Sequence, residues 1–249
     1  MGSLYNTDHF WYNVDVNEAL LLLTAVVSTG FIIVSSKFGT KENLHGSIVI
    51  FLILISTVGG KIVEFFGYET NTGNIFYASI FLATYFLIER HGRHEGSRSL
   101  WTGVVGLVSF LILIKITLLL TGSEVTSQLN QALSAAFVPT TRIAAASILA
   151  FILSQSLNIY IFVTLKEKFE GKYLWLRANV SNALSQILDS LIFFTLAFFG
   201  VASIASVLEI ILVSLTIKIV YMMVASTAIY LNRIEFGNRH DDYSTITIR

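Results

Sequence analysis

Long apolar runs alternate with short polar segments along the chain. A helix that crosses the hydrocarbon core of a bilayer needs about 20 mostly apolar residues, and the sequence contains seven runs of this kind. They cover residues 18–36, 48–67, 75–89, 101–122, 142–165, 180–200 and 207–231. The pattern predicts an all-α integral membrane protein, with seven transmembrane helices bundled in one domain over 18–231.

The basic residues between these runs indicate which end of the bundle faces the cytoplasm. Lysines and arginines follow the first, third, fifth and seventh runs and are absent after the second and sixth. Cytoplasmic loops are enriched in Lys and Arg, so segment 1–17 is expected outside a cell membrane and 232–249 is expected to be a cytoplasmic tail. Residues 129–138, on the outer side, are expected to form a short interfacial or re-entrant helix before Pro139.

Composition agrees with a membrane protein and excludes several other classes. The chain is 54% hydrophobic and 13% charged, which is more apolar side chain than a soluble fold of this size can bury. Its 16 basic and 16 acidic residues cancel, so nothing favours a nucleic-acid partner. The absence of cysteine excludes disulfides and thiolate catalysis. His91, His94 and Glu95 are interpreted as solvated loop residues, so no metal or other cofactor is expected.

Ionisable residues remain inside the predicted spans, where they are costly. They are Lys61, Glu64, Lys115, Asp189, Glu209 and Lys218. A charge near the centre of a transmembrane helix costs about 2.5–3.5 kcal/mol on insertion scales. Such residues are therefore expected to face the bundle interior, to pair with one another and to mark a pathway. Arg142 and Glu209 are expected near the outer surface, and Asp189 and Lys218 near the midplane.

An internal repeat adds amide groups at a similar depth. The two copies are SQSLNIYIF at 154–162 and SQILDSLIF at 185–193. Gln155 and Asn158 are three apart and share a helix face, as do Gln186 and Asp189. Matched polar groups near the midplane of two antiparallel spans are typical of transporter substrate sites. Such groups also serve as hydrogen bonds between packed helices, and the sequence leaves both roles open.

The second half of the sequence resembles a known family. RIAAAS at 142–147 leads into the first copy of the repeat, LWLRANVS at 174–181 leads into the second, and Glu209 and Lys218 follow in the last run. Over about residues 75–231 the pattern is similar to that of the queuosine precursor transporter family, also called the VUT or vitamin uptake transporter family. The resemblance implies a membrane importer rather than an enzyme, with a six-helix core and an extra N-terminal helix.

The resemblance also implies a substrate, a 7-deazaguanine base used as a queuosine or archaeosine precursor in tRNA modification. A guanine-like base carries neighbouring N–H donors at N1 and the 2-amino group, which one carboxylate accepts together. We expect Asp189 to take that role, and Lys218 to pair with it in the empty site or to donate to O6. The expected substrate-binding residues are Asp189, Gln186, Gln155, Asn158, Lys218, Arg142 and Glu209.

Three positions depart from the family pattern by losing a carboxylate. The family usually has Asp where this chain has Tyr85 and Asn158. Near the end of the last span an Asp-Thr-Pro is frequent, and here the residues are Ser226, Thr227 and Ala228. These losses favour a neutral base over a cationic aminomethyl base.

Other interpretations of the same residues stay open. The chain could be the substrate-binding membrane component of an ATP-driven uptake complex, and the ATPase would then be a separate chain because no P-loop is present. Seven helices with Lys218 midway along the last also fit a retinal-binding protein, although the span at 75–89 contains no Arg or Asp. The sequence leaves a homodimer open as well.

Overall fold

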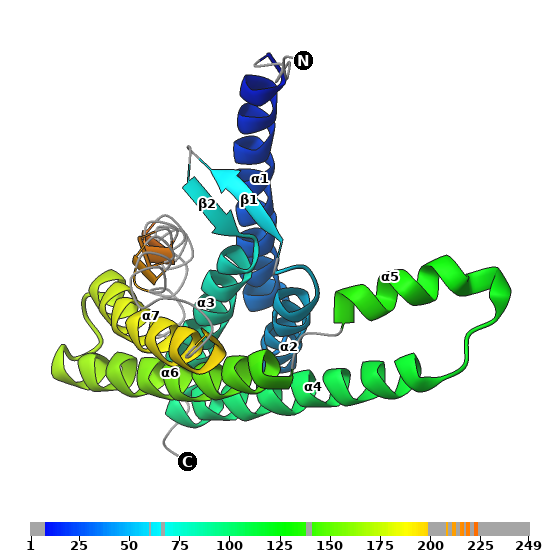
Figure 1. The fold of residues 1–249 in the computed structure, drawn as a ribbon. Coiled ribbons are helices and arrows are strands. Elements are labelled where there is room, and N and C mark those ends of the chain that lie inside the picture. The colour runs from blue at the N-terminus through cyan, green and yellow to red at the C-terminus, as the bar shows by residue number, and fades with distance from the viewer. Residues whose placement is uncertain are drawn as a thin grey trace.

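The computed structural model describes residues 8–59, 61–65, 68–137 and 141–198, and also residues 208, 211, 212, 215, 216, 218, 219, 222 and 223. Its elements are α1 (Asp8–Phe38), α2 (Lys41–Val58), β1 (Ile62–Phe65), β2 (Tyr68–Asn71), α3 (Gly73–His91), α4 (Arg93–Leu119), η1 (Glu124–Thr126), α5 (Ser127–Phe137), α6 (Thr141–Lys168) and α7 (Leu174–Phe198). Figure 1 shows their arrangement.

Five of the described helices are long and apolar enough to cross a membrane. These stretches are Val16–Phe38, Lys41–Val58, Arg93–Leu119, Ala144–Lys168 and Leu174–Ala197. They support the predicted helical membrane protein, whereas the count of seven spans and their orientation stay predictions. Most of the predicted run 207–231 lies outside the described residues.

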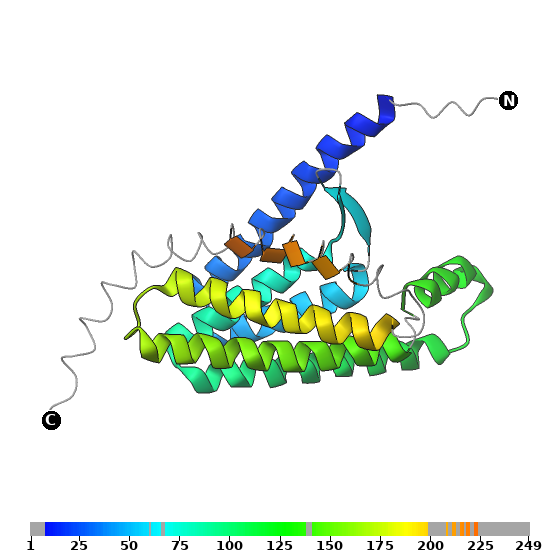
Figure 2. The same cartoon turned by 60° about the vertical axis from the view of Figure 1, so that its left-hand side comes forward.

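The helix α3 forms the centre of the described bundle. It packs against α1, α2, α4 and α6, and its side chains are buried from Asn74 to Ile88 with few exceptions. Ile80, Leu82 and Leu87 have no exposed surface. A helix that is apolar on all sides needs neighbours on all sides, which explains why this span is enclosed by the others. By contrast, α1 extends obliquely beyond the bundle (Figure 2).

A β-hairpin replaces the second half of the predicted span 48–67. The helix α2 begins at Lys41 and ends at Val58, and β1 then pairs antiparallel with β2. Lys61 and Glu64 are therefore not intramembrane helix residues, and the all-α prediction is wrong at this point. Hydropathy alone cannot separate a short apolar strand from a helix. Gly59, which caps α2, is unfavourable inside a helix.

Two further charged residues lie elsewhere than predicted. Lys115, on α4, is exposed rather than facing the bundle interior. Glu95 is only 7% exposed and accepts hydrogen bonds from Lys41 Nζ at 2.8 Å and His45 Nε2 at 2.9 Å. The solvated-loop interpretation is wrong for Glu95 because α4 begins at Arg93, eight residues before the predicted span, and this first part packs against α2.

The short outer helix predicted at 129–138 is confirmed as a helix. The structure has α5 at Ser127–Phe137, and Phe137 contacts Phe110 of α4 edge to face, with ring centroids 6.1 Å apart. This contact folds α5 back towards α4 (Figure 1). Whether it lies at the membrane interface stays a prediction.

Gly103 allows α2 and α4 to pack closely. A Cβ atom at Gly103 would lie 2.7 Å from Leu52 Cδ1 and 3.3 Å from Ile48 Cγ2. We expect Gly103→Val to lower the free energy of unfolding by about 1–3 kcal/mol through overpacking. Thermal unfolding of the detergent-solubilised protein measures this loss. Gly46→Val on α2, where a Cβ has no neighbour within 4 Å, should change the midpoint temperature of unfolding little. Equal losses of stability in the two variants would contradict the packing argument.

Candidate functional site

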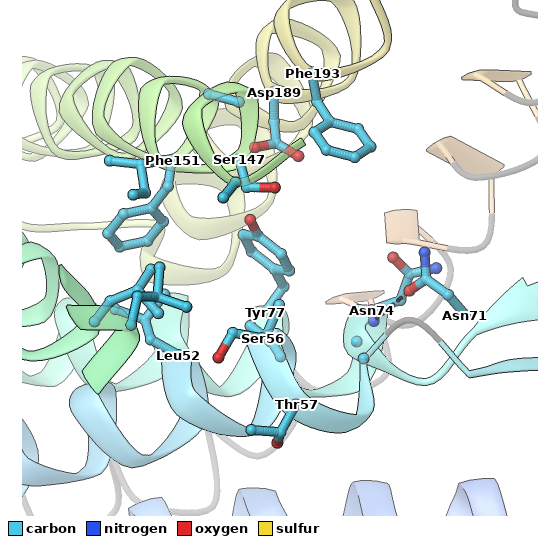
Figure 3. A pocket seen from close by; sticks show the side chains of 18 of the residues that line it. Leu52, Ser56, Thr57, Asn71, Asn74, Tyr77, Ser147, Phe151, Asp189 and Phe193 are labelled. Atoms are coloured by element: carbon cyan, nitrogen blue, oxygen red, sulfur yellow. Dashed lines mark hydrogen bonds between the residues drawn. The ribbon is translucent and has the colours of Figure 1, made fainter. Parts of the chain in front are cut away.

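A cavity of about 350 Å³ lies between α2, α3, α4, α6 and α7, next to the hairpin. Figure 3 shows its lining residues. Among the predicted binding residues, Asp189 of α7 and Lys218 line this cavity. Binding pockets for small ligands are usually concave sites of roughly 300–1,000 Å³ with a few placed polar groups. The cavity is therefore the candidate functional site.

Asp189 and Lys218 form a buried ion pair in its wall. Lys218 Nζ lies 3.0 Å from Asp189 Oδ2, and the side chain of Lys218 is 9% exposed and that of Asp189 is 6% exposed. Ser154 Oγ donates to the other carboxylate oxygen at 3.4 Å. The predicted pairing of these two charges is thus confirmed. Because each ion lies out of water, the pair neutralises charges that would otherwise be costly to bury.

Aromatic rings surround this ion pair. Lys218 Nζ lies 5.2 Å from the centroid of the Tyr77 ring, within the range of a cation–π contact. In Figure 3 the Tyr77 side chain rises from α3 towards Asp189 and Ser147. Phe193 and Phe194 also line the cavity. Such faces suit a flat ring system.

A second polar wall comes from the hairpin and the start of α3. Asn71 and Asn74 line the cavity, and Asn71 Oδ1 accepts a hydrogen bond from the Asn74 backbone N–H at 3.1 Å. Asn74 Nδ2 donates to Thr70 Oγ1 at 3.1 Å. Ser56, near the end of α2, adds a hydroxyl. Sequence reasoning missed this wall because it continued α2 through the hairpin; the Gly59-Gly60 pair was the available signal.

The predicted amide ligands lie beside the cavity rather than in its lining. Gln155 Nε2 donates to Thr84 Oγ1 of α3 at 2.8 Å, and Asn158 Oδ1 accepts from the Tyr85 hydroxyl at 2.8 Å. Gln186 is 2% exposed. In this structure the α6 amides hold α6 against α3, which is the packing role that the sequence left open. A role of these amides in substrate binding stays a prediction.

Two departures from the family pattern contact each other. Tyr85 and Asn158 share the 2.8 Å hydrogen bond described above, and the Tyr85 hydroxyl also lies 3.1 Å from Ser181 Oγ. The Tyr85 ring stacks on Phe162, with centroids 4.4 Å apart. The chain thus carries a neutral hydrogen-bonded pair at two positions where the resemblance noted in the sequence leads us to expect carboxylates.

Two predicted site residues cannot be placed. Arg142 lies in the first turn of α6, but its side chain is outside the described part of the structure, and Glu209 is outside the described residues altogether. Their predicted roles near the outer surface stay predictions. Tyr160, the tyrosine of the first repeat copy, is 59% exposed and does not line the cavity.

Comparison with known proteins agrees with the resemblance noted in the sequence. Residues 71–232 match the family described as "Putative vitamin uptake transporter". A Bacillus subtilis (strain 168) protein named "Probable queuosine precursor transporter" is 36% identical over 143 residues. That stretch is 57% of this chain and 62% of the relative's length. No solved structure matches the chain. The matched residues include the part of the cavity lining that runs from Asn71 to Lys218. This multi-pass membrane protein therefore belongs to the vitamin uptake transporter family.

Proposed function

We propose that the chain imports a 7-deazaguanine base of the queuosine-precursor type and binds it in the cavity beside Asp189. The family match and the name of the Bacillus subtilis relative support transport of such a base. The buried Asp189 carboxylate in the cavity wall is the single observation that carries the substrate assignment.

The carboxylate of Asp189 can accept both donors of the guanine-like edge. The base would take the place of Lys218 as partner of the carboxylate, and the released ammonium group would donate to O6. After this exchange each ion is hydrogen-bonded to the neutral base, so neither is left without a polar partner in a poorly hydrated site. Charge-assisted hydrogen bonds to planar N–H pairs also provide geometric specificity.

The remaining walls suit the rest of the ring system. Tyr77, Phe193 and Phe194 offer apolar faces for the flat base, and Asn71 and Asn74 provide amide groups at another wall. Asp189 and Lys218 are the charged residues among the described lining, and their charges cancel. A site without net charge favours a neutral cyano-substituted base over a cationic aminomethyl one.

A thermal-shift titration of the detergent-solubilised protein tests this proposal. A bound base raises the unfolding temperature by mass action, and saturation at 100 times Kd stabilises the fold by about 2.7 kcal/mol. We expect a shift with 7-cyano-7-deazaguanine, a smaller one with its aminomethyl analogue, and none with adenine, which lacks the paired donors at N1 and C2. Equal shifts with adenine, or none with any base, would contradict the assignment.

A further inference from the structure

The contact surface between α3 and the α6–α7 pair is polar and buried. We call this surface the seam; Thr84, Tyr85, Gln155, Asn158 and Ser181 hydrogen-bond across it, and we include the buried Gln186 of α7. Each of these side chains is at most 2% exposed. The seam begins next to the cavity, where Ser154 contacts Asp189, and continues through the Gln155–Thr84 and Asn158–Tyr85 hydrogen bonds.

Several polar atoms of the seam lack a hydrogen-bond partner. Among the described residues, these are Gln155 Oε1, Asn158 Nδ2 and Gln186 Oε1. A buried polar group without a partner costs about 1–3 kcal/mol, and native structures contain few of them. Buried water satisfies such groups in many proteins, and a second arrangement in which these atoms face an opened space would satisfy them as well.

An ion pair closes the far end of the seam. Arg177 of α7 has no exposed surface and donates from Nη1 to Glu89 Oε1 of α3 at 2.9 Å. Its other nitrogens donate to the backbone oxygens of Lys172 and Gly171, which connect α6 to α7. Lys166 Nζ adds a contact to Glu89 at 3.3 Å. These bonds hold the α6–α7 loop against the end of α3.

The seam has the length and direction of a pathway through half the bundle. Tyr77, at the cavity, and Glu89, at the closing ion pair, are both on α3, and a helix rises about 1.5 Å per residue. The twelve-residue step from Tyr77 to Glu89 therefore corresponds to about 18 Å. A bilayer core is about 30 Å thick. By the predicted orientation this end of α3 is cytoplasmic.

The packing shows which elements can separate. The helices α6 and α7 lie side by side over most of their length (Figure 2) and contact each other far more extensively than α6 contacts α3. The α6–α7 pair can therefore move as one body, and its movement away from α3 would break the few polar bonds of the seam.

We propose that the seam is the second half of the substrate pathway and that the Glu89–Arg177 ion pair closes its cytoplasmic end. This proposal rests on the transport function proposed above. When the α6–α7 pair separates from α3, the amides and hydroxyls of the seam turn to the opened space and offer both donors and acceptors. A base leaving Asp189 then exchanges partners with Gln155, Gln186 and Asn158 in turn, and water satisfies those it does not occupy.

Thiol labelling tests this proposal without any substrate. The natural chain has no cysteine, so Ser185→Cys introduces a unique thiol on the α7 face that carries Ser181. Ser185 has no exposed surface, and its hydroxyl donates within its own helix to the Asn182 carbonyl oxygen. Labelling by a polar maleimide in detergent should be slow. Adding Glu89→Gln should raise the rate about tenfold, which corresponds to a shift of about 1.4 kcal/mol in the opening equilibrium.

A matched control distinguishes opening of the seam from general loosening. Ser99→Cys, on α4, is equally buried and bonds to its own helix, and its labelling should not respond to Glu89→Gln. If Ser185→Cys misfolds, Ser181→Cys repeats the measurement from the seam itself. An unchanged rate at the seam, or an equal rise at Ser99→Cys, would overturn the proposal. Because no base is present, the result is independent of the thermal-shift titration that tests the substrate assignment.

Discussion

Replacing Asp189 by Asn is expected to reduce uptake of the 7-deazaguanine base by about 100-fold or more in a protein that still folds. Asn has nearly the same shape, but it offers one acceptor oxygen and places N–H donors against the N–H groups of the base. Hydrogen bonds to a charged group contribute about 1.5–3 kcal/mol each. Losing two of them removes about 3 kcal/mol or more, which is at least about 100-fold in binding. Uptake of radiolabelled base into proteoliposomes measures the loss.

Ser190→Ala is the matched control for this substitution. Ser190 follows Asp189 on α7 and is 1% exposed, but it does not line the cavity. Uptake by this variant should stay within a few-fold of the unmodified protein. Normal uptake by Asp189→Asn, with the control also normal, would place substrate binding elsewhere. Proteoliposomes without any ATPase also show whether the chain transports on its own.

The sequence predicts the described transmembrane helices better than it predicts their ends. Hydropathy found α1, α4, α6 and α7 because a run of about 20 apolar residues has few alternatives in a membrane protein, and it also found the shorter run that forms α3. It failed at 59–71, where Gly59 ends α2 and a hairpin follows. Hydropathy averages over residue types and does not register backbone conformation, so an apolar strand of four residues was absorbed into a helix.

Part of the candidate site was predicted from the sequence. Two opposite charges at similar depth have a strong physical reason to meet, and Asp189 and Lys218 do meet. The amides were harder to place, because residues three apart share a face without revealing which neighbour that face contacts. In the structure Gln155 and Asn158 contact α3, and the cavity takes Tyr77 and Asn74 instead. Only tertiary packing decides between such neighbours.

Lys218→Met alone is expected to lower the free energy of unfolding by about 3–5 kcal/mol. The substitution leaves the Asp189 carboxylate buried without its charged partner, and breaking a buried pair from one side costs about that much. Met has an unbranched chain of similar length, so little packing is lost. The free energy of unfolding in mixed micelles, followed by circular dichroism, measures the change.

Combining Lys218→Met with Asp189→Asn should restore most of this stability, since no buried ion is then left without a partner. The two side chains are in contact, so the double-mutant cycle should give a coupling well outside additivity. The double variant should nevertheless fail in uptake, because the introduced asparagine amide cannot replace the carboxylate that receives the base. If the losses in free energy of unfolding of the two single variants simply add in the double variant, the ion pair contributes little to the stability of the fold. Restored uptake would show that the base does not need the charge of Asp189.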